Sequence, residues 1–144
     1  MRIRPATPAD LDALVAVEDA CFGANAWSEA LVAQELAAAS RFVVVAEADA
    51  VLGYASLMEV ADVADVQRVA VVPPARRSGV GAALLDMLLM RARLSGCARV
   101  LLEVGADNDA AIGLYGSFGF EPVDRRDAYY GPGVDALVMA TALS

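Results

Sequence analysis

The stretch of sequence that decides the fold is Gln67-Arg68-Val69-Ala70-Val71-Val72-Pro73-Pro74-Ala75-Arg76-Arg77-Ser78-Gly79-Val80-Gly81-Ala82. The β-branched run from Val66 to Val72 predicts a strand, and the two prolines end it because proline cannot continue a ladder. After Gly81 the apolar residues recur at helical spacing as far as Leu94, and Gly96 suits the left-handed position that follows a helix. A strand that turns directly into a long helix is therefore predicted here.

The turn inside this stretch has the composition of a phosphate-binding site. Amide N–H groups at a helix start have no partner within the helix and can converge on an anion, and Arg76 and Arg77 add charged, forked donors beside them. The stretch lacks the Gly-Lys-Ser/Thr ending of a Walker loop, and Leu84 stands where a dinucleotide fingerprint requires a third glycine. We therefore predict a seat for a phosphate or pyrophosphate; the alternative is an exposed turn that only caps a helix.

The remaining elements describe one mixed α/β domain that spans residues 1–144. Helices are expected from Thr7 to about Ala20, from Ser28 to about Ala39, and from Asp107 or Asn108 to about Phe118, each starting at a capping side chain. Strands are expected at Arg41–Ala46 and Val51–Leu57, which form a hairpin, at Val100–Val104, and in a last pair that ends near Ala136 to Leu143. Because Val100–Val104 is almost entirely apolar, we expect it to be buried on both faces.

Composition excludes several classes of protein. No apolar stretch reaches the roughly 18 to 20 residues of a membrane span, and no leader pattern opens the chain, so a cytoplasmic location is expected. The two cysteines, Cys21 and Cys97, are far apart and predict neither a disulfide framework nor a metal site. Without histidine, proton transfer is left to carboxylate, tyrosine, thiol or water. The formal charge of −8 argues against nucleic-acid binding and favours cationic partners.

The turn also carries a resemblance to a known family. Arg76-x-x-Gly79-x-Gly81 matches the Gln/Arg-x-x-Gly-x-Gly/Ala signature with which GNAT acetyltransferases hold the pyrophosphate of coenzyme A. Other stretches resemble the RimI type of this family, the ribosomal-protein alanine N-acetyltransferases: Cys21-Phe22, Trp27-Ser28, Val69-Ala70-Val71, Leu102-Glu103-Val104, Asn108, Ile112-x-Leu114-Tyr115-x-x-Phe118-Gly119-Phe120, Tyr129-Tyr130 and Asp135 to Met139. The chain departs from that type at Ala26, where proline is usual, and in the spacing from Arg125 to Tyr130.

The resemblance implies a fold and a cosubstrate. The fold would be a mixed, mostly antiparallel sheet of about seven strands flanked by four helices, with one splayed strand pair that receives acetyl-CoA. The backbone of Val69, Ala70 and Val71 would pair with the pantetheine arm. The pyrophosphate would lie on the turn and the helix start, against Arg76, Arg77, Ser78, Gly79, Val80, Gly81 and Ala82. Asn108 would contact the cofactor, cap its helix, or do both.

Two residues are candidates for proton transfer. Glu103 is the only charge in the apolar run from Val100 to Val104, where partial desolvation would raise its pKa and make it a better base. The resemblance also places the general base at Glu103, and it assigns to Tyr115 the role of donating a proton to the leaving thiolate. The alternatives are a solvated Glu103 at a strand end and a Tyr115 that only packs in the core.

For the acceptor, the resemblance implies the N-terminal α-amine of a protein, and in particular the N-terminal alanine of a small-subunit ribosomal protein with a basic tail. The acidic chain would attract such a tail. Trp27, Tyr129, Tyr130 and Asp135 could line the peptide groove, although Trp27 could equally be a buried anchor. The alternatives are acetylation of a small amine, such as a polyamine or aminoglycoside, and a CoA-binding module without catalysis.

Overall fold

The helices and strands follow the predicted order along the chain. The structure is a computed structural model, and it describes residues 1–129, 131 and 133–143. Its α-helices within those ranges are α1 (Leu11–Phe22), α2 (Glu29–Ala37), α3 (Val80–Leu94) and α4 (Asp109–Ser117), with 3-10 turns η1 (Pro8–Asp10), η2 (Gly23–Asn25) and η3 (Pro73–Ala75). Its strands are β1 (Arg2–Pro5), β2 (Arg41–Glu47), β3 (Val51–Val60), β4 (Val63–Val71), β5 (Arg99–Gly105), β6 (Glu121–Arg126) and β7 (Ala136–Ala142).

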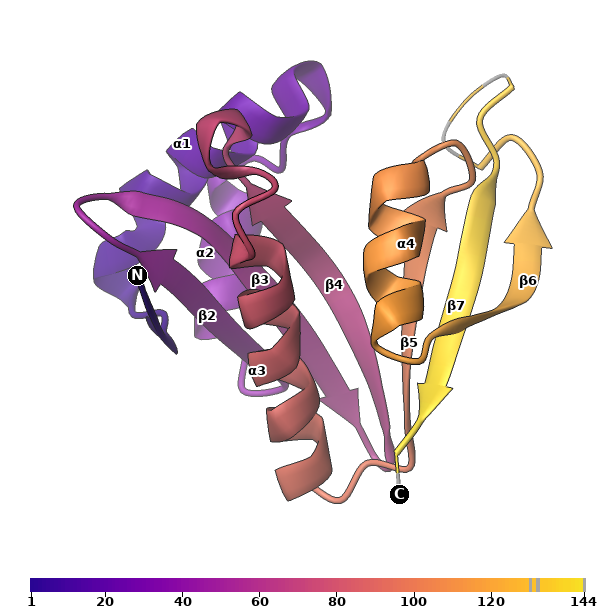
Figure 1. Cartoon of the computed structure of the whole chain (residues 1–144). Coiled ribbons are helices and arrows are strands. Elements are labelled where there is room, and N and C mark those ends of the chain that lie inside the picture. Colours follow the sequence, from indigo (N-terminus) through magenta and orange to yellow (C-terminus); the bar gives the residue numbers. More distant parts are fainter. Residues whose placement is uncertain (130, 132, 144) are drawn as a thin grey trace.

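The strands form one sheet with the order β1-β2-β3-β4-β5-β7-β6. Neighbouring strands are antiparallel in every pair except β4 and β5, which run parallel. Across the described residues, this sheet of seven strands with its four α-helices confirms the predicted mixed, mostly antiparallel architecture. The parallel pair divides the sheet into an N-terminal half (β1 to β4) and a C-terminal half (β5, β7 and β6), which diverge visibly in Figure 1.

Helices cover the two halves unequally. In Figure 1, α3 and α4 lie on one face of the sheet, while α1 and α2 lie on the other face, behind the N-terminal half. The larger buried cluster joins α3 and α4 to the sheet through residues such as Leu57, Leu84, Leu88 and Met139. A second cluster, including Leu14, packs α1 and α2 against β2, β3 and β4.

No helix within the described ranges is long and apolar enough to cross a membrane.

The predicted helix caps are largely confirmed. Ser28 caps α2 by accepting a hydrogen bond from the Leu31 N–H at 3.2 Å, and Asn108 rather than Asp107 caps α4. Gly96 adopts a φ of +80° after α3, as expected for the residue that follows a helix. Thr7, in contrast, precedes the turn η1, and α1 begins only at Leu11.

The strand boundaries differ from the prediction between Leu57 and Val66. Strands β3 and β4 continue through this segment and pair as far as Val60 opposite Val63. Ala61 permits the tight turn by adopting a φ of +55°, a conformation that glycine or asparagine usually supplies. Because neither residue type is present there, the sequence carried no signal for this hairpin.

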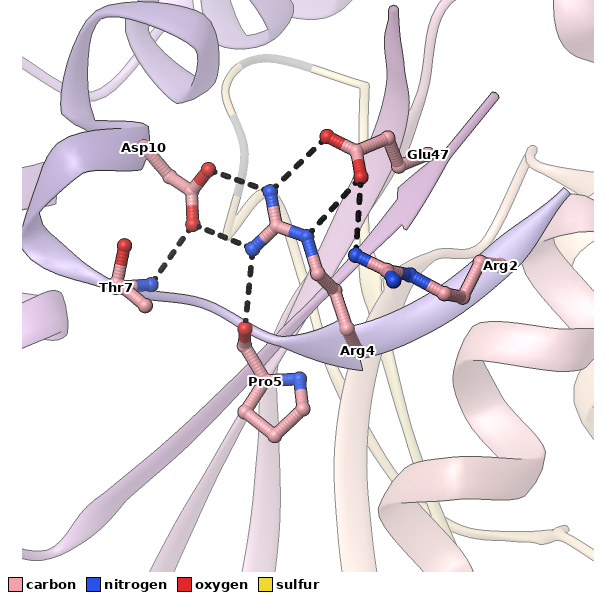
Figure 2. Close-up of polar contacts among 6 residues, drawn as sticks. All are labelled: Arg2, Arg4, Pro5, Thr7, Asp10 and Glu47. Carbon is pink, nitrogen blue, oxygen red and sulfur yellow. Dashed lines mark hydrogen bonds and ion pairs between the residues drawn. The ribbon is translucent and has the colours of Figure 1, made fainter. Parts of the chain in front are cut away.

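Strand β1 is fixed to the sheet by an ionic cluster, shown in Figure 2. The guanidinium of Arg4 donates to both carboxylate oxygens of Asp10, at 2.9 and 2.8 Å, and to both oxygens of Glu47, at 3.3 and 3.2 Å. Asp10 also accepts the Thr7 N–H at 2.8 Å. The hydrogen bond from Arg4, and then that of the Thr7 backbone, lower the pKa of Asp10 despite the opposing effect of burial. The cluster therefore joins β1, η1 and β2 through charged groups.

Candidate active site

The site begins where strands β4 and β5 separate. Their parallel pairing extends only from Val63 opposite Arg99 to Val66 opposite Leu102. Both strands continue, β4 to Val71 and β5 to Gly105, without a further pair between them among the described residues. Figure 1 shows the two ribbons moving apart beyond this point. The splayed pair inferred from the resemblance is therefore present.

A β-bulge in β4 accounts for the separation. The register of β3 and β4 shifts between Leu57 opposite Val66 and Ser56 opposite Arg68, which leaves Gln67 as an extra residue. An extra residue bends a strand and increases its local twist. The bend falls at the last residue of β4 that pairs with β5, so it turns the rest of β4 away from its neighbour.

The separated part of β4 presents an edge to the gap. Because the Val72 N–H donates to the Leu52 carbonyl at 2.9 Å, the alternation of an antiparallel ladder directs the amide of Ala70 toward β3 and the amides of Val69 and Val71 into the gap. The Val71 carbonyl accepts from Arg76 Nε at 2.9 Å and from Cys21 Sγ at 3.3 Å. Of the predicted trio, Val69 and Val71 therefore have the edge groups that a pantetheine could meet.

A cavity of about 550 Å³ occupies the gap. Its walls come from both separated strands, from α4, from the end of α1 and from the turn η2, and include Phe22, Asn25, Arg68, Val69, Glu103, Asn108 and Tyr115. A second cavity of about 320 Å³ adjoins it and is lined by Asp65, Leu101, Arg126 and Val138. The two cavities share Val66, Gln67, Leu102 and Glu103 in their walls. Glu103 therefore borders both spaces.

The turn before α3 offers unpaired amides, as the sequence predicted. Gly79 adopts a φ of +85° and directly precedes α3, and Arg77 also adopts a left-handed φ, of +63°. The N–H groups of Val80, Gly81 and Ala82 belong to the first turn of a 15-residue helix, where no carbonyl within the helix can accept them. A Cβ built on Gly79 would meet no atom within 4 Å. The turn is thus open to a ligand at the positive end of the helix dipole.

Two predicted side chains of this turn are engaged within the protein. Arg76 uses Nε to hold the Val71 carbonyl, and the Ser78 hydroxyl donates to the Ala75 carbonyl. Both hydrogen bonds brace the turn that carries the amides. Arg77 is exposed and has no ion pair or hydrogen bond within the described part of the chain, so it is the side chain of the pair most available to an anion.

Glu103 lies on the open face of β5. The expectation that this strand is buried on both faces is wrong: Val100, Leu102 and Val104 are buried under the helices, whereas Leu101 is half-buried and Glu103 is exposed. The reason is that α1 and α2 cover the N-terminal half of the sheet and leave this face of β5 without a helix. The Glu103 carboxylate pairs with Arg126 Nη1 at 2.7 Å.

Tyr115 faces the same cavity from α4. Its side chain is mostly buried, packs edge-on against Phe120 with ring centroids 5.9 Å apart, and belongs to the larger core cluster. Asn108 also borders the cavity, and its Oδ1 accepts the Ala111 N–H at 3.2 Å. The capping role of Asn108 and the core role of Tyr115 are therefore present, and both residues also face the space where a ligand would bind.

The structure describes three of the four residues predicted to line a peptide groove, and each of the three has contacts within the protein. Trp27 is half-buried against the second core cluster, which supports its role as an anchor. Asp135 accepts from the Ala128 N–H at 2.7 Å and from Arg125 at 2.6 Å, two contacts that lower its pKa and hold the loop between β6 and β7. Tyr129 is exposed and lies under Arg126, and Tyr130 is outside the described residues.

Sequence reasoning missed several residues of the two cavities. Asp65 and Arg126 border the smaller cavity with Glu103, and burial, followed by the negative charge of Glu103, raises the pKa of Asp65. Arg68 borders the larger cavity from β4, a central strand that also carries Asp65 and Gln67 among its apolar residues. The available signal was the charge itself, because a central strand rarely carries an arginine without a partner.

Comparisons with known proteins agree with the geometry. The sequence model of the acetyltransferase (GNAT) family matches residues 11–120. An uncharacterized protein of Mycobacterium leprae, ML0378, is 39% identical over 140 residues, which cover 92% of this chain but 38% of that protein. The N-alpha-acetyltransferase RimI of Mycobacterium tuberculosis is 36% identical over 140 residues, covering 92% of this chain and 87% of that protein.

The Escherichia coli protein is similar in sequence and in structure. The [ribosomal protein bS18]-alanine N-acetyltransferase of that organism is 40% identical over 95 residues, which cover 63% of this chain and 64% of that protein. Its crystal structure superimposes with a TM-score of 0.92 and 32% identity, covering 99% of this chain and 94% of that one. The sequence match thus spans less than two thirds of the length of the M. leprae and E. coli relatives.

Proposed function

The chain belongs to the acetyltransferase (GNAT) family, and from this premise we propose that it transfers the acetyl group of acetyl-CoA to the N-terminal α-amine of a protein. The observation that carries the proposal is the larger cavity, bordered by Glu103, Tyr115 and the free edge of β4, which opens where β4 and β5 separate. The names of the M. tuberculosis and E. coli relatives support an α-amine acceptor.

The donor side of the site fits acetyl-CoA, which supplies the activated acetyl thioester. The amides of Val69 and Val71 offer strand-edge hydrogen bonds to an extended pantetheine arm. The unpaired N–H groups of Val80, Gly81 and Ala82, with Arg77 beside them, suit a pyrophosphate. Gly79 leaves room for the phosphates to approach the backbone, because no side chain stands there. Asn108 would contact the cofactor from the start of α4.

Glu103 is proposed as the base that accepts the proton of the amine, directly or through one water. The α-amine of a protein has a pKa of about 7.7 to 8, against about 10.4 for lysine, so a modest base suffices for an N-terminus. Glu103 borders both cavities, and its carboxylate is exposed to an acceptor that enters from the side of Arg126. An incoming ammonium group would compete with the Arg126 guanidinium for this carboxylate.

Tyr115 is proposed as the acid that returns a proton to the leaving thiolate. It faces the larger cavity from α4, across from β4, and its ring is held by Phe120. A phenol that is fixed by packing keeps its hydroxyl in one place, which is what proton donation requires.

The proposed acceptor is a basic protein tail, and specifically the N-terminal alanine of a ribosomal protein, as in the relative from E. coli. The formal charge of −8 would attract such a tail by long-range steering. Asp65 and Glu103 line the smaller cavity with negative charge, beside the part of the larger cavity where Glu103 would meet the amine. A cytoplasmic setting, where ribosomal proteins are made, is part of the same proposal.

The test is a thiol-release assay with acetyl-CoA and three kinds of acceptor: peptides that begin with alanine, peptides with a blocked N-terminus and a free lysine, and small polyamines. We expect acetylation of the alanine peptides, at least about tenfold less activity on lysine because of its higher pKa, and loss of activity in Glu103→Gln and Tyr115→Phe. If polyamines are acetylated in preference to the peptides, the acceptor is a small amine and not a protein N-terminus. If the chain binds coenzyme A but acetylates no amine, it is a binding module without catalysis.

A further inference from the structure

Arg68 is held at the wall of the larger cavity by three neighbours. Its Nε and Nη2 donate to the two carboxylate oxygens of Glu18 at 2.9 and 2.6 Å. Its guanidinium carbon lies 3.7 Å from the ring centroid of Phe22 and 4.6 Å from that of Trp27. The carboxylate fixes the direction in which the guanidinium points, and the two rings fix the orientation of its plane. Arg68 therefore presents its remaining donors in one orientation.

Glu18 neutralises this guanidinium. The carboxylate is fully buried and also accepts hydrogen bonds from the Tyr54 hydroxyl and from the Trp27 N–H at 2.8 Å. Burial acts to raise the pKa of Glu18, but the hydrogen bonds from Arg68, Tyr54 and Trp27 outweigh it and lower the pKa, so the group stays ionised. The buried pair has no net charge, so it is poorly suited to attract a carboxylate or a phosphate.

Donors remain on Arg68 after this pairing. A guanidinium has five N–H groups, and Glu18 receives two of them. Nη1 takes part in no hydrogen bond within residues 1–129, 131 and 133–143. A donor that belongs to a neutralised pair and borders a cavity suits a neutral oxygen, and the carbonyl of a peptide bond is the most common one.

We propose that Arg68 is an acceptor-binding residue, which donates a hydrogen bond to the backbone carbonyl of the acceptor's first residue and so favours peptide N-termini over simple amines. The inference rests on the proposed function. In an α-amine acceptor only the Cα separates the reacting nitrogen from this carbonyl carbon, and both Glu103 and Arg68 border the cavity that would hold the pair. Polyamines and lysine side chains have no carbonyl at this distance from the nitrogen.

The experiment compares two acceptors with the wild-type chain. One is a peptide that begins with alanine, and the other is the same peptide with its first amide replaced by an (E)-alkene, which keeps the shape and lacks the carbonyl oxygen. A hydrogen bond from a charged donor predicts a preference for the amide of about 10- to 100-fold in kcat/KM, after correction for the α-amine pKa of each peptide. Equal kcat/KM values for the two peptides would overturn the proposal without any variant.

Arg68→Lys is the informative substitution, because lysine keeps the charge opposite Glu18 and loses the fork. We expect the amide-to-alkene ratio to fall to within about threefold of unity, with little change for the alkene peptide. Arg41→Lys is the matched control: Arg41 is also paired to a glutamate, Glu35 at 2.7 Å, and is similarly buried, but it borders neither cavity. Its ratio should equal that of the wild type.

The outcomes separate this inference from the proposed function. If Arg68→Lys lowers kcat/KM equally for both peptides while its near-UV circular dichroism matches the wild type, Arg68 only positions the wall and the inference is wrong. If the wild-type chain acetylates no peptide at all, the proposed function is wrong and the inference falls with it. If the wild-type chain acetylates both peptides with equal kcat/KM, the inference is wrong while the proposed function stands.

Discussion

In the N-terminal half of the sheet, helices cover both faces, whereas in the C-terminal half α4 covers one face and the other is open. Strands β2 and β3 each contain a run of buried residues, while every residue of β6 is exposed. The halves meet in a parallel ladder of only four residue pairs. The N-terminal half therefore contains most of the buried surface that stabilises the fold, whereas the C-terminal half can bring side chains such as Glu103 to a solvent-accessible gap.

The largest expected effect is a loss of activity without a loss of stability. Glu103→Gln should lower kcat/KM for an alanine peptide by about 10² to 10⁴, the usual contribution of a general base. Its melting temperature should stay close to that of the wild type, because the ion pair with Arg126 is partly exposed. Glu121→Gln, a change of another exposed carboxylate on the C-terminal half, is the control and should retain activity. If Glu103→Gln retained full activity, Glu103 would not be the general base.

The second prediction compares the two halves by their free energy of unfolding. Leu57→Ala, at a fully buried position of β3, should cost about 2 to 5 kcal/mol in urea denaturation. Val123→Ala, at a position of β6 that is 59% exposed, should cost about 0.5 kcal/mol or less. Similar losses at both positions would mean that the C-terminal half contributes as much buried surface as the N-terminal half.

A third prediction uses the ionic cluster of the N-terminal half. Asp10→Asn should cost about 1 to 2 kcal/mol at pH 7, since it weakens the charged hydrogen bonds from Arg4. The pKa of Asp10 is lowered in the folded state, so its contribution is complete above the unfolded pKa, near 3.9, and is lost as the pH falls through the folded value. The difference between wild type and variant should therefore shrink below about pH 4. A difference that stays constant down to pH 2 would contradict the lowered pKa.

The smallest expected effect has the opposite sign and lies where the halves meet. Burial and the charge of Glu103 raise the pKa of Asp65 in the folded state, so its charged form opposes folding once the pH exceeds the unfolded value of about 3.9. Asp65→Asn should therefore stabilise the chain slightly at pH 7, by about 0.5 kcal/mol or less, and have no effect below pH 3. A loss of stability at pH 7 would show that the charged Asp65 is favourably paired.

Local chemistry made much of the fold predictable. The caps Ser28 and Asn108, the left-handed Gly96 and the strand-to-helix turn around Gly79 each depend on residues adjacent in sequence, and each is found where expected. The shape of the gap could not be predicted in the same way. The bulge at Gln67 depends on how β4 meets β3, and the turn at Ala61 uses a residue with no turn preference.

The candidate site was predictable to the extent that its residues belong to a motif. Glu103, Tyr115, Asn108 and the glycines were expected from the pattern, and the structure brings Glu103, Tyr115 and Asn108 to one cavity. Arg68 was missed because its partner Glu18 lies 50 residues away in sequence. The open face of β5 was also missed, because an apolar run does not tell which face a helix will cover.

The most direct test of the account is calorimetric titration of coenzyme A into the wild type, Gly79→Asn and Gly79→Asp. Asparagine and aspartate both tolerate the left-handed φ of +85° and both cap helices, and a side chain there meets no atom within 4 Å, so the variants differ essentially in charge. If the phosphates lie on the start of α3, Gly79→Asp should bind coenzyme A at least about tenfold more weakly than Gly79→Asn, which adds a side chain of the same size without the charge. Equal affinity of the aspartate and asparagine variants, or no binding by the wild type, would contradict the account.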